Sequence, residues 1–131
     1  MKTVLLDSDA YSSLIKGKVE VKEELEKTDK VYVSVIVLGE LLSAFKKGNK
    51  EKENLKILER FLSKVTVEII DVERETSEVY ASTKRILEKK GNPIPINDLW
   101  IAAQTLETGS VLITYDKHFD KIPGLRLWKT K

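Results

Sequence analysis

Residues 96–116, INDLWIAAQTLETGSVLITYD, decide the fold of this chain. Within them, apolar residues at helical spacing predict a helix through residues 99–106, and residues 110–114 form an apolar strand that ends before Asp116. A helix followed by a short buried strand is typical of an α/β protein with a parallel sheet. The stretch therefore predicts one unit of such a sheet, with Asp98 and Asp116 near its edge.

The same alternation of strands and helices continues through the rest of the chain. Strands are predicted at residues 3–6, 31–35, 65–70 and 110–114, with a last short strand at residues 125–128. Helices are predicted at residues 10–16, 19–27, 36–47, 51–64, 73–90 and 99–106. No internal repeat, low-complexity tract or linker interrupts this pattern. We therefore expect a single α/β domain over residues 1–131, with a central, mostly parallel sheet flanked by helices.

The composition excludes several kinds of chemistry. The chain has no cysteine, which excludes a thiol nucleophile and a cysteine zinc site. Its single histidine, His118, excludes a histidine acid–base pair, and we interpret it as a surface loop residue. The common phosphate-cradling glycine motifs and the serine-elbow motif are also missing. Carboxylates are therefore the main candidates for catalysis.

The charge balance argues against nucleic-acid binding through an overall basic field. Lys and Arg number 23 and Asp and Glu number 21, for a formal net charge of +2. If the protein handles RNA or DNA, a local site must do so. No apolar run approaches the roughly 18 residues of a membrane span. Asp7 follows the first apolar run too early for a signal peptide, so we expect a cytoplasmic protein.

Four acidic residues are predicted to meet at one edge of the sheet. Asp7 follows the first strand directly and Asp116 follows the strand at residues 110–114. Glu40 lies in the first turns of the helix after the second strand, and Asn97 or Asp98 opens a later helix. Ligands of open parallel sheets bind outside the carboxyl ends of the strands. We therefore expect the four carboxylates to share one rim.

Such a group of carboxylates fits a hard cation better than a network of salt bridges. Glu40 stands in an apolar stretch and has no basic residue within one helical turn on either side. A carboxylate in apolar surroundings costs several kcal/mol unless something pairs with it. Mg²⁺ or Mn²⁺ prefers oxygen ligands, activates water and neutralises a phosphodiester. The alternative is structural: Asp98 as a helix cap, Asp7 and Asp116 as turn residues, and Glu40 as a tolerated rim residue.

Three segments in order along the chain resemble the PIN-domain family, and within it the VapC-type toxin ribonucleases. They are VLLDSDAY at residues 4–11, SVIVLGELLSAF at residues 34–45, and IPINDLWIAAQTLETGSVLITYDKHFDKIPGLRLW at residues 94–128. The spacing of N-D-x-x-I-A-A and T-x-D-x-x-F is the most specific part of the resemblance. Together the segments span nearly the whole chain.

The resemblance implies a three-layer α/β/α domain that is a metal-dependent RNA endonuclease, the toxin of a type II toxin–antitoxin pair. The catalytic and metal-binding acids of the family match Asp7, Glu40, Asp98 and Asp116, and its hydroxyl residue matches Thr114. These acids would bind Mg²⁺ or Mn²⁺, and one of them would help to deprotonate the attacking water. The resemblance also implies an RNA substrate, a cognate antitoxin that inhibits the site, and a homodimer.

One departure from the family pattern concerns Asp9. The family usually has a neutral polar residue two positions after its first acid, whereas this chain reads Asp7-Ser8-Asp9. Asp9 either joins the site or caps the first helix, and we favour the cap. The same three residues also resemble the D-x-D motif of haloacid-dehalogenase-type phosphatases, with Asp7 as nucleophile and Asp9 as general acid. A non-catalytic PIN domain that binds a partner or RNA is the second alternative.

Overall fold

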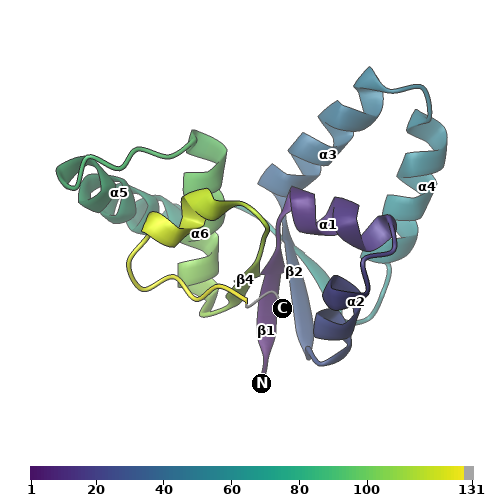
Figure 1. Ribbon diagram of the computed structural model, residues 1–131, viewed down its shortest axis with the longest axis horizontal. Coiled ribbons are helices and arrows are strands. Elements are labelled where there is room, and N and C mark those ends of the chain that lie inside the picture. Colours follow the sequence, from purple (N-terminus) through teal and green to yellow (C-terminus); the bar gives the residue numbers. More distant parts are fainter. Residues whose placement is uncertain (129–131) are drawn as a thin grey trace.

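A four-stranded parallel sheet lies at the centre of the computed structural model, which describes residues 1–128 (Figure 1). The strands are β1 (Thr3–Leu6), β2 (Lys30–Ser34), β3 (Val67–Ile70) and β4 (Val111–Ile113). Their order in the sheet is β3-β2-β1-β4, and every neighbouring pair is parallel. The register pairs Val4 of β1 with Val31 on one side and with Val111 on the other. The prediction of a mostly parallel sheet is confirmed.

Six α-helices cover this sheet in two layers. They are α1 (Ser8–Ile15), α2 (Val19–Glu26), α3 (Val35–Lys47), α4 (Glu51–Leu62), α5 (Arg74–Lys89) and α6 (Ile96–Thr108). Helices α5 and α6 lie on one side of the sheet and α1 to α4 on the other (Figure 1). The three-layer α/β/α architecture is therefore confirmed.

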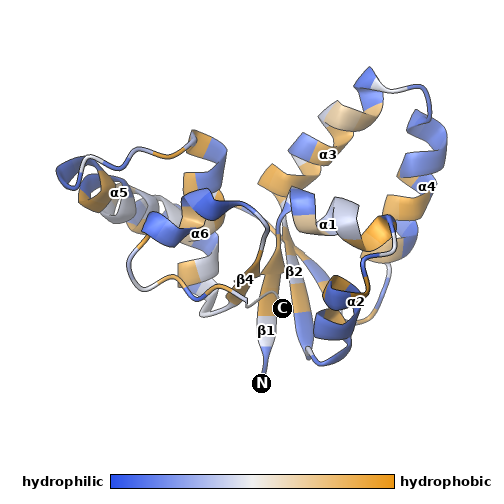
Figure 2. Ribbon diagram, viewed as in Figure 1, coloured by the Kyte–Doolittle hydropathy of each residue, from blue (hydrophilic) through white to orange (hydrophobic). Residues whose placement is uncertain are grey.

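The neighbouring strands β1 and β4 are largely apolar and buried because helices cover both faces of the sheet. Val4, Leu5 and Leu6 of β1 are buried, as are Leu112 and Ile113 of β4. Strands that are buried on both faces have continuous apolar runs rather than an alternating pattern. Figure 2 shows these strands as a hydrophobic layer between helices whose outer faces are largely hydrophilic.

Two helices begin at other residues than the sequence predicted. The N-cap of α1 is Asp7, whose side chain accepts a hydrogen bond from the Ala10 amide at 2.9 Å, so the prediction that Asp9 caps this helix is wrong. Helix α6 begins at Ile96 after Pro95, without a side-chain cap, rather than at Asn97 or Asp98. Proline fixes its own backbone near helical φ, so the chain can enter a helix without a capping side chain. The Asp98 carboxylate is therefore free of a capping role.

The end of the described chain also differs from the prediction. The strand expected at residues 125–128 is reduced to one parallel bridge between Leu127 and Leu112 of β4. A 3₁₀ helix, η1 (Lys117–Lys121), precedes it and starts directly after Asp116. This short helix matters for the site because it follows the carboxyl end of β4.

The order of the strands reverses at β1. From β1 the chain proceeds outward through β2 and β3, and it then returns to add β4 on the opposite side of β1. In open parallel sheets, ligands bind where the strand order reverses, outside the carboxyl ends of the strands. The ends of β1 and β4, which carry Asp7 and Thr114, therefore flank the expected binding position.

Candidate functional site

Asp7 is the most buried acid at this edge of the sheet. Its side chain follows β1 and the residue is only 4% exposed. Burial raises the pKa of its carboxyl from the ordinary 3.8 to about 7, and the nearby charges of Asp9 and Asp98 act in the same direction. Hydrogen bonds with the Thr114 side chain and the Ala10 backbone oppose the shift without cancelling it. The fold therefore holds this carboxylate in an unfavourable environment.

Asp98 lies in the first turn of α6 and interacts electrostatically with the other three acids. Burial raises the pKa of its carboxyl, and the charges of Asp116 and Glu40 raise it further. Asp116 lies between β4 and η1, and its backbone amide donates to Thr114 Oγ1 at 2.9 Å. These like charges repel one another in the absence of a cation.

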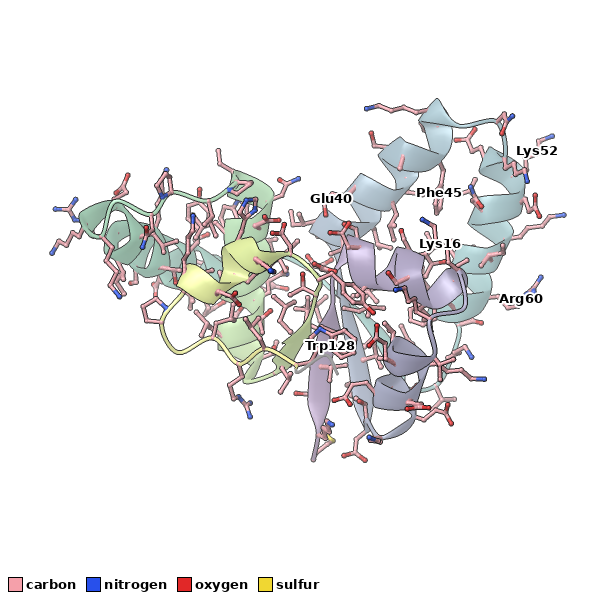
Figure 3. All side chains as sticks on the ribbon, in the orientation of Figure 1. Lys16, Glu40, Phe45, Lys52, Arg60 and Trp128 are labelled. Atoms are coloured by element: carbon pink, nitrogen blue, oxygen red, sulfur yellow. The ribbon has the colours of Figure 1, made fainter. Side chains whose placement is uncertain are left out.

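Glu40 reaches the same region from the opposite helical layer. It lies on the side of α3 that faces α6 (Figure 3), and Asn97 Nδ2 of α6 donates to its Oε2 at 3.5 Å. Its other oxygen, Oε1, is buried and has no hydrogen-bond partner among the described residues. A buried carboxylate oxygen without a partner costs free energy that a cation would recover. The surroundings of Glu40 are mixed rather than purely apolar, because Ser43, Lys47 and Asn97 line the same hollow as Val35 and Ile36.

The structure brings all four predicted acids to one edge of the sheet, and we call them the acidic cluster: Asp7, Glu40, Asp98 and Asp116. The two predicted supporting residues have different surroundings. Thr114 is buried and contacts both Asp7 and Asp116, whereas Asp9 is exposed on the first turn of α1 and acts on Asp7 through its charge.

The sequence interpretation missed the position of His118. Its Nδ1 lies 3.1 Å from Asp116 Oδ1 and 3.4 Å from Asp98 Oδ2, so it is part of the site rather than an unrelated surface residue. The side chain is 49% exposed, so His118 does lie at the surface as expected, but its ring also contacts two acids of the site. The available signal was its place two residues after Asp116, where a tight helical turn returns the chain toward its cap.

The residues of this edge fit a divalent cation. Carboxylate oxygens are the preferred ligands of Mg²⁺ and Mn²⁺. Among residues 1–128, the lysines that form ion pairs bind other acids, namely Glu24, Glu51 and Glu68. Donor atoms of Asp98, Asp116 and His118 lie within 4.8 Å of one another, which is close enough for a single ion. The unpaired Oε1 of Glu40 supports the same interpretation.

Comparison with known proteins gives an independent line of evidence. A sequence profile of the PIN domain matches residues 4–125. Ribonuclease VapC2 of Rickettsia felis is 37% identical over 106 residues, which cover 80% of this chain and 78% of that protein. The tRNA(fMet)-specific endonuclease VapC of Salmonella typhimurium is 28% identical over 130 residues, or 97% of each chain.

The solved structures show the same likeness in three dimensions. A chain in the crystal structure of VapBC2 from Rickettsia felis, bound to a DNA fragment from their promoter, superposes with a TM-score of 0.86. The sequence identity is 31%, and the match covers 96% of this chain and 97% of that one. Within residues 1–128, no helix is both long and apolar enough to cross a membrane.

Proposed function

The chain belongs to the PIN-domain family and is a ribonuclease of the VapC toxin type, and we propose that its acidic cluster binds the divalent ion required for RNA cleavage. The observation that carries this proposal is the concentration of acids near the carboxyl ends of β1 and β4, with one buried Glu40 oxygen left without a partner. The proposal extends over one domain, residues 1–131, with Mg²⁺ or Mn²⁺ as the ion.

The roles of the residues follow from their positions. A bound divalent ion would neutralise the scissile phosphate and lower the pKa of the attacking water. Asp98 and Asp116 offer oxygens from α6 and from the end of β4, and Asp7 offers one from the end of β1. Thr114 fixes Asp7 and the Asp116 backbone relative to each other. One carboxylate of the cluster would accept a proton of the attacking water as the water oxygen bonds to phosphorus; the P–O bond to the leaving ribose oxygen breaks, and that oxygen takes up a proton from solvent.

The family match argues against the phosphatase alternative, and the ribonuclease names of the relatives argue against a non-catalytic domain. Asp9 gives the phosphatase alternative no structural support, because it is exposed at the start of α1. A D-x-D phosphatase needs this second acid at the reacting atoms.

An apolar groove on the other side of the molecule is the proposed binding surface for an antitoxin. The solved relatives include toxin–antitoxin complexes. The groove has a volume of about 560 Å³ and is formed by α1, α2, α4 and the adjacent ends of β2 and β3. Its apolar lining residues are Leu14, Ile15, Leu25, Val31, Ile57, Phe61 and Val67. An amphipathic helix buries its apolar face in a groove of this kind.

Charges at the rim indicate which kind of helix fits. Lys22, Arg60 and Lys64 line the groove together with one acid, Glu26. Arg60 extends from the outer side of α4 in Figure 3. We therefore expect an antitoxin helix with an apolar stripe flanked by acidic residues, since complementary charges favour the correct partner and orientation.

A homodimer is also part of the proposal. Leu42 and Ile96 are large apolar residues that are 38% and 61% exposed, and they lie on α3 and α6, the same helices that carry Glu40 and Asp98. Exposed apolar residues of this size mark interaction surfaces when they lie together. Sedimentation of the purified protein and of Leu42→Glu tests this surface, since the variant is expected to shift the protein toward the monomer.

The central experiment is a calorimetric titration of Mn²⁺ into the wild type and into Asp98→Asn. We expect the variant to bind Mn²⁺ at least about tenfold more weakly, because it removes a charged ligand while it keeps the shape of the side chain. Asp29→Asn is the matched control, since Asp29 lies near the amino-terminal end of the sheet and accepts a hydrogen bond from the Lys2 amide. Equal Mn²⁺ binding by all three proteins would overturn the assignment of the acidic cluster.

A further inference from the structure

His118 is held in place by the backbone of η1 rather than by its own side chain. Its backbone amide donates to Asp116 Oδ1 at 2.9 Å, which makes Asp116 the N-cap of η1. The next residue, Phe119, is only 1% exposed and anchors the turn in the core. The hydrogen bond to Asp116 and the buried neighbour Phe119 therefore fix the position of the imidazole, although half of its surface is open to solvent.

The ring nitrogen is at the spacing expected for ligands of one ion. Nδ1 lies 3.1 Å from Asp116 Oδ1 and 3.4 Å from Asp98 Oδ2. Two ligands that are each about 2.1 Å from an ion and at right angles to each other lie about 3.0 Å apart. Two carboxylate oxygens and one imidazole nitrogen are therefore already grouped around a position that one ion can occupy.

We propose that Nδ1 of His118 is a ligand of the divalent ion and that it makes the site select Mn²⁺ over Mg²⁺. This inference rests on the proposed function, because it concerns the same ion. Imidazole nitrogen binds first-row transition metals well, whereas Mg²⁺ strongly prefers oxygen ligands and water. A site made only of carboxylates would not discriminate between the two ions in this way.

A different role for the same ring is a contact with two carboxylates and no bond to the ion. In that case, His118 would compete with the ion for Asp98 and Asp116, and its removal would strengthen metal binding. The two roles therefore predict opposite changes in affinity, which makes them separable by experiment.

The chain offers a direct spectroscopic test because His118 is its only histidine. Protein without an affinity tag is prepared with ¹⁵N-labelled or natural-abundance histidine and loaded with one equivalent of Mn²⁺. Electron spin echo modulation of the bound Mn²⁺ is then recorded. We expect a nitrogen coupling from a directly bound imidazole, which changes from the ¹⁴N to the ¹⁵N pattern on labelling and is absent in His118→Gln.

Calorimetry supplies the second measurement. His118→Gln is expected to weaken Mn²⁺ binding by about tenfold or more and to change Mg²⁺ binding by less than about threefold. Lys117→Gln is the matched control: Lys117 lies in the same short helix, carries a positive charge, is exposed, and forms no ion pair among the described residues. It should leave both affinities and the nitrogen coupling unchanged.

The outcomes separate the failure of this inference from that of the proposed function. If Mn²⁺ binds to the wild type, is weakened by Asp98→Asn and shows no histidine coupling, the acidic cluster stands and His118 is not a ligand. Tighter Mn²⁺ binding by His118→Gln would equally overturn the inference. If Mn²⁺ does not bind to the wild type, both the metal site and the role of His118 are wrong.

Discussion

The acidic cluster and the apolar groove are two regions of this small protein that are built in opposite ways. The cluster collects like charges at the ends of β1 and β4 and in the first turns of α3 and α6, and it leaves the Glu40 Oε1 atom without a partner. The groove collects apolar side chains from α1, α2 and α4. Like charges repel one another in the acidic cluster until a cation binds there, whereas the apolar groove gains free energy when a matching apolar surface covers it.

In our proposal, the acidic cluster carries out the chemistry and the apolar groove recognises the partner. Groups that reduce stability persist in a fold when a function depends on them. Apolar grooves recognise partners through shape and buried area, so changes in them should alter binding and leave catalysis intact. The two regions are therefore expected to respond separately to substitution.

The largest effect is expected from Asp98→Asn on RNA cleavage. Loss of the charge that couples Glu40, Asp7 and Asp116 should reduce the rate of cleavage by about a thousandfold or more. The fold should remain intact, because Asp98 caps no helix and its charge is repelled by its neighbours. Cleavage of RNA by equal amounts of wild type and variant, with circular dichroism as the control for folding, measures the effect. Full activity in the variant would contradict the proposed site.

The second largest effect is expected in the stability of the metal-free protein as a function of pH. The folded state raises the Asp7 pKa from 3.8 to about 7, so the folded protein binds this proton more tightly than the unfolded chain does. The contribution of Asp7 is therefore most favourable below about pH 4 and is lost as the pH rises to about 7, by on the order of 4 kcal/mol.

Asp7→Asn isolates this contribution because asparagine is also a good N-cap for α1. In urea unfolding with a chelator present, the variant should gain stability relative to the wild type as the pH rises from 4 to 7. Added Mn²⁺ should stabilise the wild type more than the variant at pH 7, since an ion that binds only the folded state increases its stability. A constant difference between the two proteins across this pH range would show that Asp7 has no raised pKa.

A smaller effect is expected at the apolar groove. Ile15 lines the groove and is 43% exposed, so Ile15→Asp should weaken binding of the cognate antitoxin by about tenfold or more with little effect on folding. Ile86→Asp is a matched control, because Ile86 is also 43% exposed but lies on α5 in the opposite helical layer. Both variants should cleave RNA at the wild-type rate. Equal antitoxin binding by the two variants would exclude the groove as the partner site.

The sequence predicted the fold well because strands and helices are encoded locally. Each of the four main strands and all six helices was expected within a few residues of its observed bounds, since apolar runs and helical periodicity are local signals. The reduced strand at residues 125–128 was harder to predict, since it depends on one bridge to Leu112 and not on its own pattern.

The site was predicted in part for the same reason. Asp7 comes directly after β1 and Asp116 follows β4 after Thr114 and Tyr115, so their meeting at one edge follows from a parallel sheet. The position of His118 depends instead on the turn of η1 and on the burial of Phe119, neither of which is visible in residue spacing. The choice between Asp7 and Asp9 as the cap also needed the backbone conformation of the turn.

The smallest effect is expected from Asp9→Asn, and it sharpens the boundary of the acidic cluster. Asp9 is exposed and influences Asp7 through its charge, and this effect on the Asp7 pKa is smaller than those of burial and of the hydrogen bonds with Thr114 and Ala10. Removal of this charge should change Mn²⁺ affinity and RNA cleavage by less than about threefold, because exposed charges are screened by solvent and salt. Cleavage measured at low and at high salt should show a smaller difference from the wild type at high salt. A loss of activity as large as that of Asp98→Asn would instead place Asp9 at the reacting atoms, which is the arrangement of a D-x-D phosphatase and not of this nuclease site.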